Sequence, residues 1–136
     1  MYDVAIYAFM HDGARASHVA LGRRGAFAHN DVCALREECA ALRGRTASVS
    51  VVVECVYSMD GSVTPLCVTL DTINAVFLAG NAHMAVHEIY VTGLYGRGLI
   101  ALLGVEKRVL GPLHMFGKAL AASGGAYSIF LGYDKD

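Results

Sequence analysis

Apolar positions recur at helical spacing in two parts of the chain. Asn30 or Asp31 can cap the first predicted helix, and Gly44 ends it. Thr64 followed by Pro65 predicts the start of the second helix. Each helix carries one apolar stripe typical of a face packed on a core. The stripes are Val32, Leu35, Cys39 and Leu42 in the first helix, and Leu66, Leu70, Ile73 and Phe77 in the second.

Apolar runs rich in β-branched residues predict the strands, the clearest of them over residues 46–58. The remaining strands are predicted over residues 3–10, 18–21, 88–93, 99–103, 113–120 and 127–131. Turn residues 95–98 and 123–125 predict two hairpins, with a helix over 113–122 as the competing interpretation of the last one. The order predicts an α+β fold, in which helices pack on a mostly antiparallel sheet within one domain, residues 1–136.

Composition narrows the class of protein. The 136 residues are 55% hydrophobic and 17% charged, which excludes a disordered chain. A net charge of −1 excludes the strong basic excess of a free-standing nucleic-acid binder. No apolar run is long enough for a membrane span. The four cysteines form no CxxC pair and no export signal is evident, so we expect reduced thiols in an intracellular protein.

The segment from Arg45 to Met84 resembles the core of the RNase PH family. A long strand runs into an Asp-Gly-Ser turn at Asp60, and the following helix ends in Ala-Val-x-x-Ala-Gly. Residues 3–10, 88–103 and 123–132 resemble other elements of that family in the same order. The resemblance implies an RNase PH-like mixed sheet with two helices packed on it, trimmed at both ends.

Active members of that family hold inorganic phosphate with an arginine placed just after the Asp-Gly turn, because an anionic nucleophile needs a cation there. Here Ser62 follows the turn, and neither Arg nor Lys occurs between Arg45 and Arg97. No Asp occurs in residues 72–133 to act as acid or metal ligand.

The resemblance therefore implies a non-catalytic, structural subunit of an exosome-type ring, without a cofactor. Its implied partners are other RNase PH-like subunits and single-stranded RNA, with no membrane, in the nucleus and cytoplasm. The basic residues predicted to contact RNA are Arg43, Arg45, Arg97, Lys107 and Arg108.

Three other interpretations were weighed. His83 and His87 would share one face of a helix but lack the further ligands of a zinc site, so no metal is predicted. Asp60, Ser62 and His83 could form a catalytic triad, although ordinary surface polarity explains them as well. The alternative function is a profilin-like or longin-like module that binds actin or proline-rich partners. A hairpin over residues 113–131 favours the ring subunit, and one helix there favours the profilin-like module.

Overall fold

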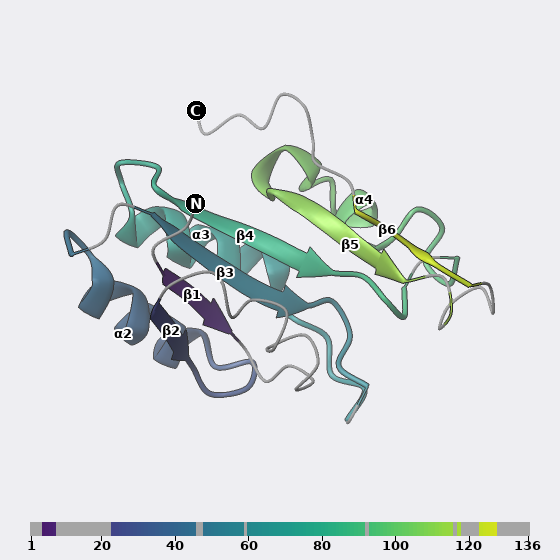
Figure 1. Ribbon diagram of the computed structural model, residues 1–136, viewed down its shortest axis with the longest axis horizontal. Helices are drawn as coiled ribbons and strands as arrows, with labels where there is room; N and C mark the ends of the chain where they lie inside the picture. The colour runs from purple at the N-terminus through teal and green to yellow at the C-terminus, as the bar shows by residue number, and fades with distance from the viewer. Residues whose placement is uncertain are drawn as a thin grey trace.

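A six-stranded sheet organises the residues described by the computed structural model, which are 4–7, 23–45, 48–58, 60–91, 93–115, 117 and 123–127. The strand order is β2-β1-β3-β4-β5-β6 (Figure 1). The first five of these strands run parallel, and β6 pairs antiparallel with β5. The strands are β1 (Val4–Tyr7), β2 (Arg23–Ala26), β3 (Val49–Glu54), β4 (Ala82–His87), β5 (Gly111–Met115) and β6 (Gly125–Tyr127). The helices are α2 (Val32–Leu42), α3 (Leu66–Val76), α4 (Leu99–Leu103) and the 3-10 turn η1 (Glu106–Arg108).

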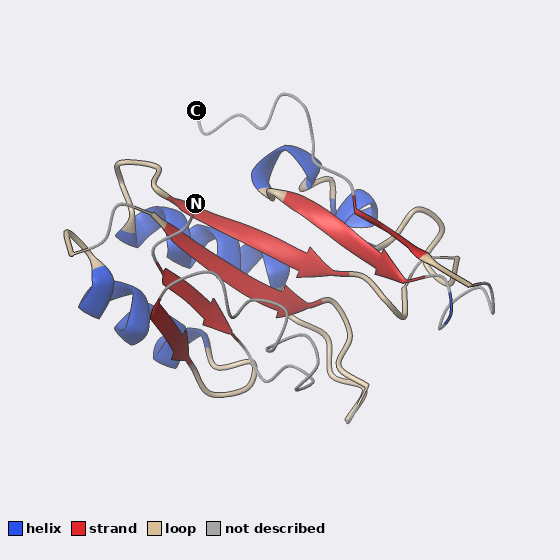
Figure 2. Ribbon diagram, viewed as in Figure 1, coloured by secondary structure: helices blue, strands red, loops and turns tan. Residues whose placement is uncertain are grey.

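The core lies between one face of the sheet and the helices α2 and α3, which pack on each other behind the strands in Figure 2. Every residue of β3 is buried. Alternate residues of β3 and β4 enter the hydrophobic core, because successive side chains of a strand point to opposite faces. The core residues of the two strands are Val49, Val51, Val53, Ala82, Met84 and Val86.

The opposite face of β3 and β4 carries the polar residues. Ser50 is the register partner of His83, and Glu54 is the register partner of His87. None of the four belongs to the hydrophobic core. The last residues of two central strands therefore place a carboxylate beside an imidazole, on the face away from α2 and α3.

The helices begin and end close to where the sequence predicts them. The Oδ1 atom of Asp31 accepts hydrogen bonds from the N–H groups of Cys33 and Ala34, so Asp31 caps α2. At α3 the cap is one residue later than predicted, at Pro65. The Thr64 hydroxyl donates to the carbonyl oxygen of Glu54 instead of capping the helix. No helix among the described residues is long and apolar enough to cross a membrane.

The predicted α+β class with a mostly antiparallel, RNase PH-like sheet is wrong. The strands alternate with helices and pair in parallel, which is an α/β arrangement. Strands buried on both faces are apolar throughout, so their sequence does not distinguish parallel from antiparallel pairing. The unit β3–α3–β4 is a crossover between parallel neighbours, for which a helix is the usual connection.

Several individual elements were also predicted wrongly, because the sequence did not reveal the parallel pairing of the strands. The hairpin predicted over residues 88–103 is wrong: residues 88–98 contain no strand in the part that is described, and residues 99–103 form α4. The strand of this region is β4, just upstream. β2 (Arg23–Ala26) was not predicted, and the predicted strand over residues 18–21 lies outside the described residues. β5 and β6 pair antiparallel, as the last hairpin predicts, but β5 ends at Met115, β6 begins at Gly125 within the predicted turn at residues 123–125, and residue 117 between them is helical.

Candidate active site at the carboxyl edge of the sheet

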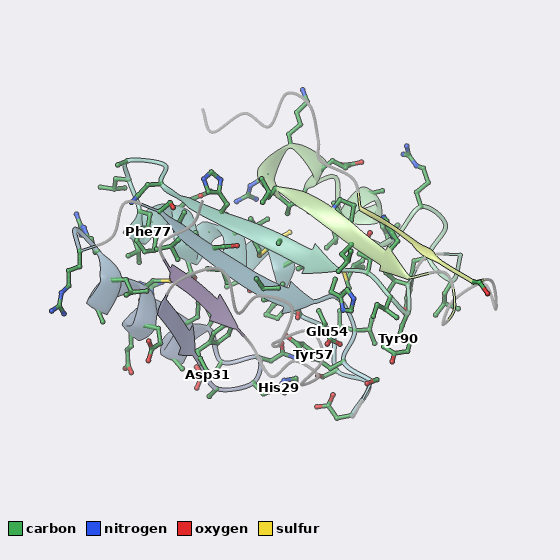
Figure 3. All side chains as sticks on the ribbon, in the orientation of Figure 1. His29, Asp31, Glu54, Tyr57, Phe77 and Tyr90 are labelled. Carbon is green, nitrogen blue, oxygen red and sulfur yellow. The ribbon has the colours of Figure 1, made fainter. Side chains whose placement is uncertain are left out.

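The carboxyl ends of the parallel strands meet at one edge of the sheet. In open α/β sheets this edge binds ligands, next to the point where the strand order reverses. Here the reversal lies at β1, because β2 is on one side of it and β3 is on the other. Figure 3 shows His29, Glu54, Tyr57 and Tyr90 gathered at the arrowhead ends of the strands, with Phe77 toward the opposite end.

Glu88 is a buried carboxylate at this edge, with only 1% of its surface exposed. Its Oε1 atom accepts hydrogen bonds from the N–H of Ile100, at 2.9 Å, and from the Sγ of Cys55, at 3.4 Å. The Nε2 of His114 lies 3.9 Å from its other oxygen. A side chain at Gly98 would collide with this carboxylate. Glu88 therefore joins the start of α4 to the ends of β3 and β5, which is a structural role.

Burial controls the ionisation of the thiol next to Glu88. Burial raises the pKa of Cys55 far above its ordinary value, and the nearby Glu88 carboxylate raises it further. Cys55 consequently stays a neutral hydrogen-bond donor. It is a poor nucleophile in this position, because the thiolate is the reactive form of cysteine.

Glu54 and His87 form a second buried polar pair, each with 7% of its surface exposed. The Nδ1 of His87 lies 3.9 Å from the Oε1 of Glu54, which is too long for a hydrogen bond. Among the described residues, this Nδ1 atom has no hydrogen-bond partner. An unsatisfied buried polar group costs about 1–3 kcal/mol, so native proteins rarely keep one without a functional reason.

The phenol of Tyr57 is the other buried group without a hydrogen-bond partner in the described part of the chain. Burial raises its pKa, while the neighbouring Thr64 hydroxyl acts in the opposite direction. The ring of His29 packs edge-on against Tyr57, with 4.4 Å between the ring centroids. His87 ends β4 and Tyr57 follows β3, so both groups lie at the carboxyl ends of central strands.

An outer cluster connects the segment after β2 to the segment after β3. The Nε2 of His29 lies 2.8 Å from the hydroxyl of Ser62 and 3.1 Å from the carboxylate of Asp60. The backbone N–H of Ser62 donates to Asp60 and lowers the pKa of that carboxyl. A catalytic triad needs the acid and the hydroxyl on different ring nitrogens. Here Asp60 and Ser62 both contact Nε2 of His29, so the three residues do not form a triad. Their contacts instead hold the segment after β2 against the segment after β3.

The structure does not assemble the motifs weighed from the sequence. His83 and His87 lie on a strand instead of a helix, and at ~3.3 Å per residue they are roughly 13 Å apart. His83 stands at the amino end of β4, away from the Asp60 and Ser62 turn. Within the described residues no group of His, Cys, Asp or Glu side chains could hold a metal ion.

The five residues predicted to contact RNA lie on three separate connections. Arg43 and Arg45 are exposed after α2, and Arg97 is exposed before α4. Lys107 and Arg108 belong to η1, and Arg108 pairs with the carboxylate of Asp71. None of the five belongs to the buried polar groups at the carboxyl edge.

The family model for class I and II aminotransferases matches residues 2–129. The chain belongs to this family. A relative from Emericella nidulans, an 8-amino-7-oxononanoate synthase, is 36% identical over 91% of this chain and 32% of its own length. A serine palmitoyltransferase from Caulobacter vibrioides is 35% identical over 90% of this chain and 30% of its own.

Solved structures agree with this family. The serine palmitoyltransferase of Sphingomonas wittichii is 29% identical and matches with a TM-score of 0.77, over 90% of this chain and 31% of the other. A variant SPT solved with pyridoxal phosphate (PLP) is 25% identical with a TM-score of 0.76, over 93% of this chain and 32% of the other. The chain spans about a third of the length of the relatives that it matches.

Membership of the aminotransferase family overturns the RNase PH interpretation. The predicted exosome ring subunit, its RNase PH-like partners and its RNA-processing role are wrong. The prediction of a protein without catalytic activity is also contradicted, because the relatives are named as synthases and transferases. The profilin-like alternative is wrong for the same reason. The resemblance rested on a strand, an Asp-Gly turn and a helix, which is a combination that parallel α/β sheets also use.

The residues at the carboxyl edge fit PLP by their chemistry. PLP enzymes place a polar partner, usually Asp or Arg, at the pyridine nitrogen of the cofactor. Among the residues whose burial the structure describes, no Asp or Arg is buried. The edge instead offers the unpartnered Nδ1 of His87, a group able to contact a heteroaromatic ring nitrogen, with the carboxylate of Glu54 beside it.

Glu54, His87 and Glu88 were missed as site residues from the sequence. A usable signal was present, because each polar residue directly follows a buried apolar strand. That signal points to a site only where neighbouring strands are parallel and end at the same edge. The predicted antiparallel sheet would have sent the ends of adjacent strands to opposite edges.

Proposed function

We propose that this chain contributes the cofactor-binding sheet of a PLP-dependent acyltransferase that joins an acyl group to an amino acid. The observation that supports it most strongly is the buried Nδ1 of His87, which has no hydrogen-bond partner among the described residues and lies next to Glu54 at the edge where α/β sheets bind ligands. The names of the relatives supply the reaction class: one is a serine palmitoyltransferase, and another makes an amino ketone.

PLP, when bound, supplies an electron sink that stabilises negative charge on the carbon next to the amino group of the substrate. The side chains of this chain would hold the cofactor, keep water away from it and fix protons at defined atoms. Glu88 would keep the start of α4 against the carboxyl edge, and the outer cluster around His29 would hold the loops after β2 and β3.

A lysine is required as well, because PLP enzymes attach the cofactor through a lysine amine. The chain has three lysines. Lys107 is exposed on η1, which precedes β5 and so lies away from the carboxyl end of that strand. Lys118 and Lys135 lie outside the described residues. Lys118 follows Met115, the last residue of β5, within three positions of the sequence. We therefore propose Lys118 as the attachment residue.

The test is to add PLP to the purified protein, reduce the mixture with borohydride and map the modified lysine by mass spectrometry. Lys118 should carry the reduced cofactor, and Lys118→Ala should lose it. Lys107→Ala is the matched control and should keep it. Modification spread evenly over all lysines, or none above that of unfolded protein, would contradict the proposal.

A second experiment tests the reaction class. The PLP-loaded protein is incubated with serine and a palmitoyl thioester, and with an amino acid and an oxo acid in parallel. We expect free thiol release only in the first mixture. Amino-group exchange in the second mixture alone would assign a transaminase instead of an acyltransferase.

A further inference from the structure

His87 differs from Glu88 and Thr64 at the carboxyl edge because its Nδ1 makes no hydrogen bond within the described residues. Glu88, nearby, accepts hydrogen bonds from Ile100 and Cys55. Thr64 donates to a main-chain carbonyl oxygen. By contrast, the Nδ1 of His87 has no such partner, although only 7% of the residue's surface is exposed.

The location of this pair restricts what it can contact. Glu54 and His87 are register partners and the final residues of β3 and β4. They lie on the sheet face opposite α2 and α3, whereas Glu88 is held on the side of α4. A ligand at the carboxyl edge would reach the imidazole from the end of the strands.

We propose that the Nδ1 of His87 contacts the pyridine nitrogen of PLP, with the carboxylate of Glu54 beside the same nitrogen. This inference rests on the proposed function and assigns one contact within it. It also names a departure in chemistry, because an imidazole takes the place usually given to Asp or Arg.

An imidazole nitrogen and a pyridine nitrogen can share one proton. One of the two must donate and the other accept, since each has a single site in the plane of its ring. The Oε1 of Glu54 lies 3.9 Å from the same Nδ1 atom, so the carboxylate stands beside the proposed contact.

The experiment measures binding instead of turnover. The apoprotein is titrated with PLP and with the analogue in which a C–H group replaces the ring nitrogen, and both dissociation constants are measured by fluorescence. The same pair is measured for His87→Leu, Glu54→Gln and the control His83→Leu. His83 lies on the same strand and face as His87 but at the other end of β4.

The unmodified protein should bind PLP more tightly than the analogue, by about tenfold for one buried hydrogen bond. In His87→Leu that preference should disappear while affinity for the analogue stays the same, which also shows that the site is folded. Glu54→Gln should reduce the preference in part, and His83→Leu should retain it.

Two results would overturn the contact while leaving the proposed function in place. A His87→Leu protein that keeps the full preference for PLP would assign the ring nitrogen to another residue. Equal loss of affinity for PLP and for the analogue would make His87 a structural residue only. If the unmodified protein binds neither molecule, the proposed function itself fails and the contact fails with it.

Discussion

At the scale of single residues, the buried carboxylate of Glu88 depends on the absence of a side chain at Gly98. Gly98 has φ of +108° and ψ of 170°, a backbone region that is essentially restricted to glycine. A Cβ atom there would also overlap the Glu88 carboxylate. The nearby Gly96 has φ of +61° and open space around its Cα, so the two glycines differ in what surrounds them.

This difference predicts unequal costs of the same substitution. Gly96→Ala should reduce the free energy of unfolding by about 1 kcal/mol, through backbone strain alone. Gly98→Ala should cost at least about 3 kcal/mol, because strain and displacement of a buried carboxylate add together. Urea unfolding of both variants measures the difference. Equal losses would mean that Glu88 moves aside without cost.

The buried cysteines predict loss of stability at alkaline pH. Burial, assisted by the Glu38 carboxylate, raises the pKa of Cys39 to about 11. An unfolded thiol ionises near pH 8.5–9, so the folded state holds its proton more tightly. The contribution of the Cys39 thiol to the free energy of unfolding is complete below pH ~8.5 and is lost as the pH rises toward 11. Cys55 and Tyr57 shift in the same direction.

The free energy of unfolding should therefore fall between pH 8.5 and 11, by up to about 2 kcal/mol from Cys39. Urea unfolding across this range measures the slope. Cys39→Ala should be less stable at pH 8 because it leaves a small cavity, but its slope should be shallower. An identical slope in the variant would show that Cys39 does not carry the effect.

At the scale of elements, α2 shows how far local sequence determines structure. Asp31 supplies a side-chain cap to two N–H groups, and no other acidic residue lies in the first turn. Asp31→Ala should therefore reduce the free energy of unfolding by about 1 kcal/mol, while Asp31→Asn should retain most of the stability. Glu37→Ala is the control, since Glu37 is exposed in the middle of the helix and should change little. Thermal or urea unfolding of the three variants checks this order.

The helices could be predicted because their signals are local. A cap, a stripe at 3.6-residue spacing and a terminal glycine lie within a dozen residues, and Leu35 and Cys39 are buried as the stripe requires. Strand pairing is not local. No residue near Val49–Glu54 indicates that this strand pairs with Val4–Tyr7 on one side and with Ala82–His87 on the other. The direction of the sheet was therefore inferred from turn residues, which misassigned residues 88–103.

The candidate site depended on that same information. Glu54 and His87 are far apart in the sequence and become neighbours only through the parallel register of β3 and β4. By contrast, the basic residues predicted to contact RNA rested on charge and local loop sequence, and they lie on separate connections in the structure. A single domain over residues 1–136 and an intracellular location stay predictions.

At the scale of the whole molecule, the surface keeps several large apolar side chains. Leu94 is 75% exposed and Leu102 65% exposed, within the same stretch between β4 and β5. Exposed apolar area of this kind promotes association. We expect the chain by itself to self-associate, and the double substitution Leu94→Ser with Leu102→Ser to shift it toward monomer.

Sedimentation velocity over a range of concentrations measures this shift. Leu78→Ser is the control, because Leu78 is 77% exposed but follows α3 on a different connection. The unfolding midpoint should change little in any of these variants, since exposed positions contribute little to the core. A chain that stays monomeric at high concentration before any substitution would contradict the prediction.

The position of β1 inside the sheet has a consequence for synthesis on the ribosome. Val4 pairs with Arg23 on one side and with Val49 on the other, so β1 is synthesised well before β3, one of its two partners. At ~5–20 residues per second, the wait for β3 is roughly 2–9 s. During that time an apolar strand has an open edge, which is a template for another nascent chain. Slower translation upstream of β3 should therefore increase aggregation more than the same delay placed after β4.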